Sequence, residues 1–245
     1  MGDLERFADE RRRNIAKLGS DDVLGKEAVR MTETLIQHRY VFNFDWLGLP
    51  IIQFPPDIIA LQEICWTVKP AVVIETGVAR GGSLALYASM MQLLGSDGFV
   101  IGVDVDIRSH NREAIEAHPL ADRIRLVEGS SIDPGTVAEV ASMVGDRGPV
   151  LVVLDSLHTK DHVLAELEAY SPLVGSGSFV VVQDTAIEAL SEDVYPDRPW
   201  HHGNSPANAV DEFLAQPDCR FAVDEDFASK LVFTSTPRGF LRCIA

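Results

Sequence analysis

The sequence predicts one α/β domain, residues 1–245, built on a doubly wound and mostly parallel sheet. From residue 70 onward, short β-branched runs alternate with helical patterns of roughly 10–15 residues. Runs such as 150–154 and 179–182 are apolar throughout, as in strands that are buried on both faces of a parallel sheet. Strands alternating with helices place helices on both faces of that sheet.

The elements follow in order along the chain. The first 60 residues, with an amphipathic helix at 21–38 and an aromatic, proline-containing connector at 42–56, are expected to form a helical cap or a subunit interface. Strands are predicted at 71–75, 99–104, 123–128, 149–155 and 178–184, and helices at 82–94, 110–117, 134–144 and 161–173. The tail, residues 221–244, has two weaker strand patterns on either side of a turn at 235–239.

Composition excludes several classes of protein. A hydrophobic content of 46% excludes intrinsic disorder. The formal net charge of −16 argues against a nucleic-acid partner, because such surfaces need clustered Lys and Arg. No apolar run approaches the roughly 20 residues of a spanning helix, so no membrane association is expected. Three cysteines far apart in sequence favour a reducing compartment, and the predicted location is the cytoplasm.

Acidic residues close all five predicted strands. They are Glu75, Asp104, Glu128, Asp155 and Asp184. Ligands of open parallel sheets bind beyond the carboxyl ends of the strands. Any single one of these acids could instead cap the next helix or face water. Five acids at one edge of the sheet favour a binding site.

The first strand leads into a glycine-rich turn, 75–83 (ETGVARGGS). Glycines allow a tight turn and a close approach of backbone to a ligand. Asp104 lies 22 residues beyond Gly82, where an acid binds a ribose diol. The glycine-rich turn and the acid together predict a cofactor that contains a nucleoside. They do not decide between a nicotinamide cofactor and S-adenosylmethionine. Glu75 inside the turn favours S-adenosylmethionine, because a carboxylate repels a pyrophosphate and suits a cationic ligand.

The fourth and fifth strands predict the reactive centre. Asp155 and Asp184 end neighbouring strands about 5 Å apart, a spacing at which two carboxylates hold Mg²⁺ with waters. His158 is a candidate base for a substrate hydroxyl, with a structural role as the alternative. His162 is interpreted as a histidine on the helix surface.

A long irregular loop, 191–208, follows the fifth strand and is expected to cover the site as a substrate lid. Trp200 suits the face of a sugar or an aromatic ring. His201, His202 and Asn204 offer hydrogen bonds to the acceptor. A mobile surface loop is the alternative interpretation.

Several motifs resemble the cephalosporin hydroxylase/rhamnosyl O-methyltransferase family. They are 46–53 (WLGLPIIQ), 74–83 (IETGVARGGS), 128–134 (EGSSIDP), 154–167 (LDSLHTKDHVLAEL) and 234–242 (TSTPRGFLR). The resemblance implies a class I S-adenosylmethionine-dependent methyltransferase, with seven strands of which the last is antiparallel. It also implies metal-assisted methylation of a sugar hydroxyl.

The resemblance also assigns residues. Its cofactor positions fall on Glu75, Gly77, Gly81, Ser83, Asp104, Ser130 and Ser131, and Thr76 and Gly82 of the same turn are assigned with them. Its metal carboxylates fall on Asp155 and Asp184, and its shared histidine on His158. Gln183 stands where relatives often carry Glu, and its amide oxygen is assigned as a third ligand. No histidine is followed two residues later by Asp or Glu, so an iron oxygenase site is not visible.

The sequence therefore predicts an O-methyltransferase that uses S-adenosylmethionine and Mg²⁺. The expected acceptor is a small deoxysugar or glycoside, and the chain is expected to form a homo-oligomer. The alternatives are a nicotinamide-dependent oxidoreductase and a family member that binds cofactor without turnover.

Overall fold

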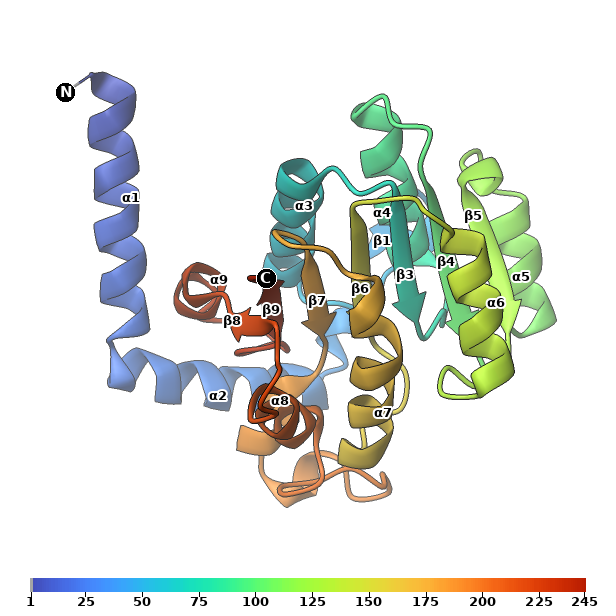
Figure 1. Ribbon diagram of the computed structural model, residues 1–245. Helices are drawn as coiled ribbons and strands as arrows, with labels where there is room; N and C mark the ends of the chain where they lie inside the picture. Colours follow the sequence, from blue (N-terminus) through green and yellow to red (C-terminus); the bar gives the residue numbers. More distant parts are fainter. Residues whose placement is uncertain (1) are drawn as a thin grey trace.

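The apolar runs of the sequence form one seven-stranded sheet in a computed structural model that describes residues 2–245 (Figure 1). The strands are β3 (Val72–Thr76), β4 (Phe99–Asp104), β5 (Ile124–Glu128), β6 (Val150–Leu154), β7 (Phe179–Val182), β8 (Phe221–Val223) and β9 (Phe240–Cys243). Their order across the sheet is β5-β4-β3-β6-β7-β9-β8. The first five are parallel, and β9 is antiparallel to both neighbours. The predicted sheet is confirmed.

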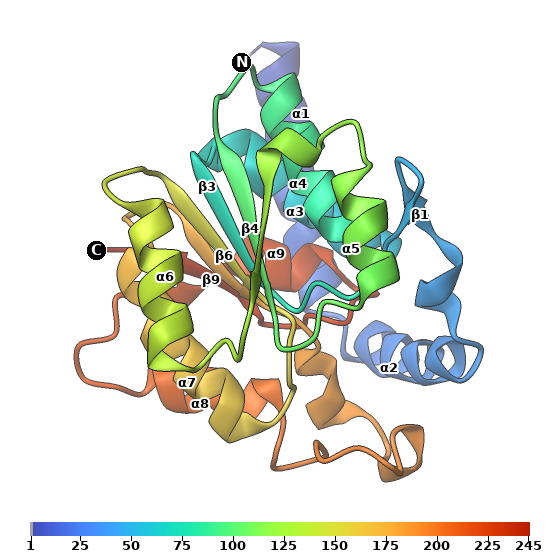
Figure 2. The same cartoon turned by 90° about the vertical axis from the view of Figure 1, so that its right-hand side faces the viewer.

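Helices cover both faces of this sheet, as Figure 2 shows. One face packs against α3 (Pro55–Val68), α4 (Gly82–Leu93) and α5 (Ser109–Glu116). The other packs against α6 (Pro134–Val144), α7 (Lys160–Tyr170) and α8 (Pro206–Leu214). Successive strand residues alternate between the two cores, so Val73 contributes to the first and Ile74 to the second. Burial on both faces explains why β6 and β7 are apolar throughout.

The N-terminal region contains two helices, of which only the second was predicted. α2 (Asp22–Gln37) begins after Asp21, whose side chain accepts hydrogen bonds from the N–H groups of Val23 and Leu24. α1 (Asp3–Gly19) has no buried residue and lies at the periphery, beside α9 (Glu225–Lys230) (Figure 1). The N-terminal segment, 1–60, therefore contains the helix α1 in addition to the predicted helix at 21–38.

The aromatic connector holds short elements of its own. A 3₁₀ turn, η1 (Tyr40–Asn43), precedes the two-stranded ribbon of β1 (Asp45–Trp46) and β2 (Leu49–Pro50). The Phe54 ring meets Phe233 at 4.7 Å, edge to face. This contact ties the connector to the C-terminal part of the chain.

The predicted lid, 191–208, ends earlier than expected, because α8 begins at Pro206. Ser205 caps α8 in a reciprocal pair with Asn208, and Pro206 occupies the first turn. The loop proper spans 191–205, with the short 3₁₀ turn η5 (Glu192–Val194) inside it. Among the helices of residues 2–245, none has the length and apolar character needed to cross a membrane.

Candidate active site

Two carboxylates meet at the carboxyl edge of the sheet because β6 and β7 are parallel neighbours in register. Leu154 pairs with Val182, so Asp155 and Asp184 emerge at the same end. The Asp155 N–H donates to the Thr76 carbonyl at 2.9 Å, which continues the β3–β6 ladder to this point. Asp184 has a φ of 56°, a left-handed conformation that is uncommon for a residue with a side chain. Strained backbone of this kind concentrates at functional sites.

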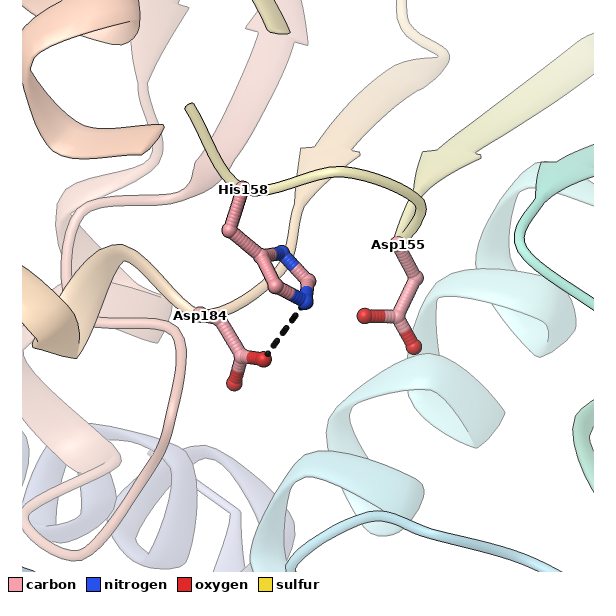
Figure 3. Close-up of side chains that lie close together, drawn as sticks. All are labelled: Asp155, His158 and Asp184. Atoms are coloured by element: carbon pink, nitrogen blue, oxygen red, sulfur yellow. Dashed lines mark ion pairs between the residues drawn. The ribbon is translucent and has the colours of Figure 1, made fainter. Parts of the chain in front are cut away.

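His158 completes a cluster with the two acids (Figure 3). One ligand atom from each of the three residues lies within 4.8 Å of the others. His158 Nε2 is 3.3 Å from Asp184 Oδ2, and the Trp200 ring stands edge-on to the imidazole at 4.8 Å. The sequence prediction that these three residues meet agrees with the geometry.

The electrostatics of the cluster favour a cation. Burial raises the pKa of Asp155 well above its usual range, and the nearby Asp184 carboxylate raises it further. A divalent cation between the two carboxylates would offset both effects. Oxygen ligands from one or two carboxylates, completed by water, are what Mg²⁺ prefers. The donor set therefore fits Mg²⁺, with His158 as an adjacent base or a third ligand.

The cluster faces a pocket of about 610 Å³. Its walls come from several parts of the chain that lie far apart in sequence. Helix α2 contributes Thr32 and Ile36, the loop after β7 contributes Tyr195 and Trp200, and Ser235 comes from the tail. The cap and the lid loop thus both enclose the space above the acids. Trp200 Nε1 is buried and has no hydrogen-bond partner within residues 2–245.

The glycine-rich turn lies beside this pocket, between β3 and α4. Gly77 has a φ of 91°, and a Cβ there would lie 2.1 Å from the Asp155 carbonyl oxygen, so only glycine fits. Gly81 also has a positive φ, 82°, and Gly82 begins α4. The turn is supported from outside, since Asn111 Nδ2 donates to the Ala79 carbonyl at 2.7 Å.

Asp104 contacts the turn directly. Its Oδ2 accepts a hydrogen bond from the Val78 N–H at 2.9 Å, and its Oδ1 accepts one from the Asp106 N–H at 3.1 Å. A carboxylate has about four lone-pair sites, so acceptor capacity remains for ribose hydroxyls. The acid therefore shapes the turn as well as being available to a ligand.

Glu75 and Thr76 point into the protein rather than toward open space. Glu75 is fully buried and accepts hydrogen bonds from Ser83 Oγ at 2.5 Å and Tyr87 OH at 3.2 Å. Burial raises the pKa of Glu75 to about 8, and the two hydrogen bonds oppose that rise. Thr76 is fully buried, and its Oγ1 accepts from the Asp155 N–H at 3.4 Å. These side chains hold the turn and the strand ends in place, and their contact with the cofactor stays a prediction.

Ser130 and Ser131 follow β5, and Ser131 belongs to a buried polar network that the sequence did not reveal. Ser131 Oγ lies 3.0 Å from His162 Nε2, and Ser156 Oγ donates to Glu166 Oε1 at 2.7 Å. Glu166 is fully buried and His162 Nε2 lies 3.5 Å from it. The interpretation of His162 as a surface histidine is wrong, because its side chain is only 14% exposed.

Gln183 lies outside the metal cluster. Its side chain is 2% exposed, and its Oε1 accepts a hydrogen bond from Thr236 Oγ1 at 2.5 Å. Gln183 faces Thr236 in the tail, whereas Asp184 faces the pocket. The amide therefore is not among the side chains lining the pocket, and the predicted third ligand is not placed with the acids.

Only Trp200 of the four predicted lid residues lines the pocket. Asn204 Oδ1 accepts a hydrogen bond from the Lys160 N–H at 3.0 Å, which ties the loop to the start of α7. His201 Nδ1 lies 2.8 Å from the His202 carbonyl oxygen, and His202 Nδ1 lies 3.1 Å from that of Glu188. His201, His202 and Asn204 thus shape the loop.

The fold and this site define a class of protein. A seven-stranded sheet in this strand order, with one antiparallel strand and a glycine-rich turn after β3, is the fold of class I methyltransferases. Two solved structures share the fold. A CmcI structure with Mg and SAM has a TM-score of 0.57 at 21% identity, covering 83% of this chain and 78% of that one. The O-methyltransferase from Bacillus cereus in complex with SAH has a TM-score of 0.53 at 15% identity, covering 82% of each chain.

Sequence relatives narrow the class to a family. The family model for rhamnosyl O-methyltransferase/CmcI matches residues 38–244. Rhamnosyl O-methyltransferase of Mycobacterium tuberculosis (strain ATCC 25618 / H37Rv) is 30% identical over 208 residues, 82% of this chain and 81% of the relative. That of Mycobacterium leprae (strain TN) is 26% identical over 197 residues, 80% of this chain and 81% of the relative. The chain belongs to the rhamnosyl O-methyltransferase/CmcI family, and the predicted resemblance is confirmed.

Proposed function

We propose that this chain transfers a methyl group from S-adenosylmethionine to a hydroxyl of a small, sugar-like acceptor. The observation that carries the proposal is the cluster of Asp155, His158 and Asp184 at the floor of a 610 Å³ pocket, beside the glycine-rich turn. The relatives' activity on rhamnosyl groups supports a sugar acceptor. Trp200 supports it further, since an indole offers an apolar face and its unpaired N–H is a donor for a hydroxyl.

The residues of the cluster divide the chemistry between them. Bound S-adenosylmethionine supplies a methyl group on a positively charged sulfur, and Mg²⁺ held by Asp155 and Asp184 supplies polarisation of the acceptor oxygen. His158 takes the hydroxyl proton on Nε2. The imidazolium that results lies beside Asp184 Oδ2, 3.3 Å away, which stabilises its charge. The pocket walls orient the acceptor oxygen, and orientation contributes much of the rate enhancement.

Calorimetry distinguishes this function from a nicotinamide-dependent one. We expect S-adenosylhomocysteine to bind and NADH not to bind, because Ala79 stands where a pyrophosphate-binding turn has its second glycine, and Asp155 lines the space beside the turn. Methylation of free rhamnose or a rhamnoside, followed by mass spectrometry, then separates an enzyme from a family member that only binds cofactor. Tight binding of NADH with no response to S-adenosylhomocysteine would overturn the proposal.

We further propose that the N-terminal helices mediate self-association. α1 has no buried residue yet exposes Leu4 (84%) and Phe7 (66%), and α2 exposes Val23 (72%). Helices of this kind are stabilised by packing an apolar face against a partner. Light scattering should give a multiple of the monomer mass, and Phe7→Asp should lower it. Leu93→Asp, at an equally exposed site on α4, is the matched control and should leave the mass unchanged. A wild-type monomer would rule out this interface.

We also propose that the chain has no nucleic-acid partner and that it is located in the cytoplasm. A net charge of −16 supports the absence of a nucleic-acid partner, because phosphates would be repelled. Cys65, Cys219 and Cys243 are all free, which supports a cytoplasmic location. Cell fractionation checks the compartment, and recovery of the chain outside the cytoplasm would contradict it.

A further inference from the structure

Gln53 is a buried polar side chain without partners. It is 5% exposed, and neither Oε1 nor Nε2 has a hydrogen-bond partner among the atoms of residues 2–245. Buried amides are almost always paired, because each unmet donor or acceptor loses its bonds to water. An amide with both atoms unmet therefore points to a ligand that pairs with it.

Gln53 lies between two pockets. It lines the 610 Å³ pocket above the acids, and it also lines a much smaller pocket beside the glycine-rich turn. Ile52, Ala79 and Asp155 line both pockets as well, so these four residues mark the boundary. The backbone there is fixed, because the Ile51 N–H donates to the Phe44 carbonyl at 2.9 Å and Phe54 caps α3.

The chemistry of an amide limits what the ligand is. Gln53 offers one acceptor oxygen and one NH₂ donor side by side, so its complement carries both a donor and an acceptor. The smaller pocket also includes Gly82 and Ser83, at the start of α4. The first N–H groups of a helix have no partner inside it and attract a carboxylate. A zwitterionic amino-acid group meets all of these requirements at once.

We propose that Gln53 binds the aminoacyl end of S-adenosylmethionine, with Nε2 donating to the α-carboxylate and Oε1 accepting from the α-ammonium group. The assignment rests on the proposed function. It gives a role to the last residue of the segment 46–53, which the sequence singled out without saying what it does. Gln53 is thereby a cofactor-binding residue contributed from outside the sheet.

The product S-adenosylhomocysteine and its analogue 5′-methylthioadenosine test the assignment by calorimetry. S-adenosylhomocysteine carries the aminoacyl end, and 5′-methylthioadenosine lacks it. Gln53→Leu should weaken S-adenosylhomocysteine by about 10- to 100-fold, as expected for lost hydrogen bonds to charged groups, and leave 5′-methylthioadenosine within about twofold. Asp104→Ala should weaken both ligands, because they share the ribose. Gln92→Leu, an exposed glutamine on α4, is the matched control and should change neither.

Thermal unfolding shows that each variant is folded. Gln53→Leu should keep or raise Tm, because it removes a buried amide that has no partner in the protein. Equal loss of both ligands, or unchanged affinity for S-adenosylhomocysteine, would overturn the assignment while leaving the proposed function in place. A wild-type chain that binds neither ligand would instead overturn the proposed function, and this assignment with it.

Discussion

Replacing His158 with alanine is expected to lower kcat by about 10²–10⁴ and to leave S-adenosylhomocysteine affinity nearly unchanged. The imidazole is 14% exposed, faces the acceptor pocket and lies 3.3 Å from Asp184. It is therefore placed to take a proton at the reacting centre. Steady-state kinetics give kcat, and calorimetry gives the affinity.

His201 supplies the matched control for this variant. It is an exposed histidine on the lid loop and does not line the pocket, so His201→Ala should retain nearly full activity. His162 is unsuitable as a control, because its side chain is only 14% exposed and contacts Glu166 and Ser131. Wild-type kcat in His158→Ala would assign proton removal to another group and leave His158 a structural role.

Removing divalent cations should have an effect of similar size. If Asp155 and Asp184 hold Mg²⁺, EDTA is expected to lower kcat by roughly 10²–10³, in line with the several kcal/mol that a Lewis acid contributes, and added Mg²⁺ should restore it. Asp184→Asn should reproduce the loss and raise the Mg²⁺ concentration needed for half-maximal rescue. Both effects of the variant follow from the loss of one of the two anionic metal ligands.

Asp193→Asn is the matched control for the metal experiment. Asp193 is exposed in the loop that follows β7 and lies outside the cluster, so its removal should not change the Mg²⁺ dependence. Full activity of the wild-type chain in EDTA would contradict the metal role. The two acids would then act on the acceptor directly.

Much of the fold could be predicted because short stretches of sequence identify the strands of the sheet. The run 150–154 (VLVVL) is apolar on both faces, and this alone identifies a central parallel strand. Parallel pairing then brings Asp155 and Asp184 to one edge without any further information. The helix α1 lacks such a signal, since it is highly charged and buries no residue.

The unpredicted parts of the site depend on contacts between distant segments. Gln183 and Asp184 are neighbours in sequence, but Thr236 binds the Gln183 amide, which separates it from the acids. Asn204 was predicted to bind the acceptor, yet its Oδ1 accepts a hydrogen bond from the Lys160 N–H. The sequence could not single out Gln53 within the segment 46–53, because the lack of hydrogen-bond partners for its buried amide is visible only in the structure. Side-chain partners of this kind are set by tertiary packing.

The insertion of β9 between β7 and β8 has a consequence for the order in which the site assembles during synthesis. The Val182 N–H donates to the Gly239 carbonyl at 2.8 Å, and the Ala186 N–H donates to the Ser235 carbonyl at 3.0 Å, so residues on both sides of Asp184 depend on this late segment. A nascent chain translated through Asp184 already carries both acids and His158, but β7 is still an open edge. Such edges invite pairing with other chains. The enzyme would thus gain its reactive centre and lose its exposed edge in the same late step of folding, when residues 235–243 leave the ribosome.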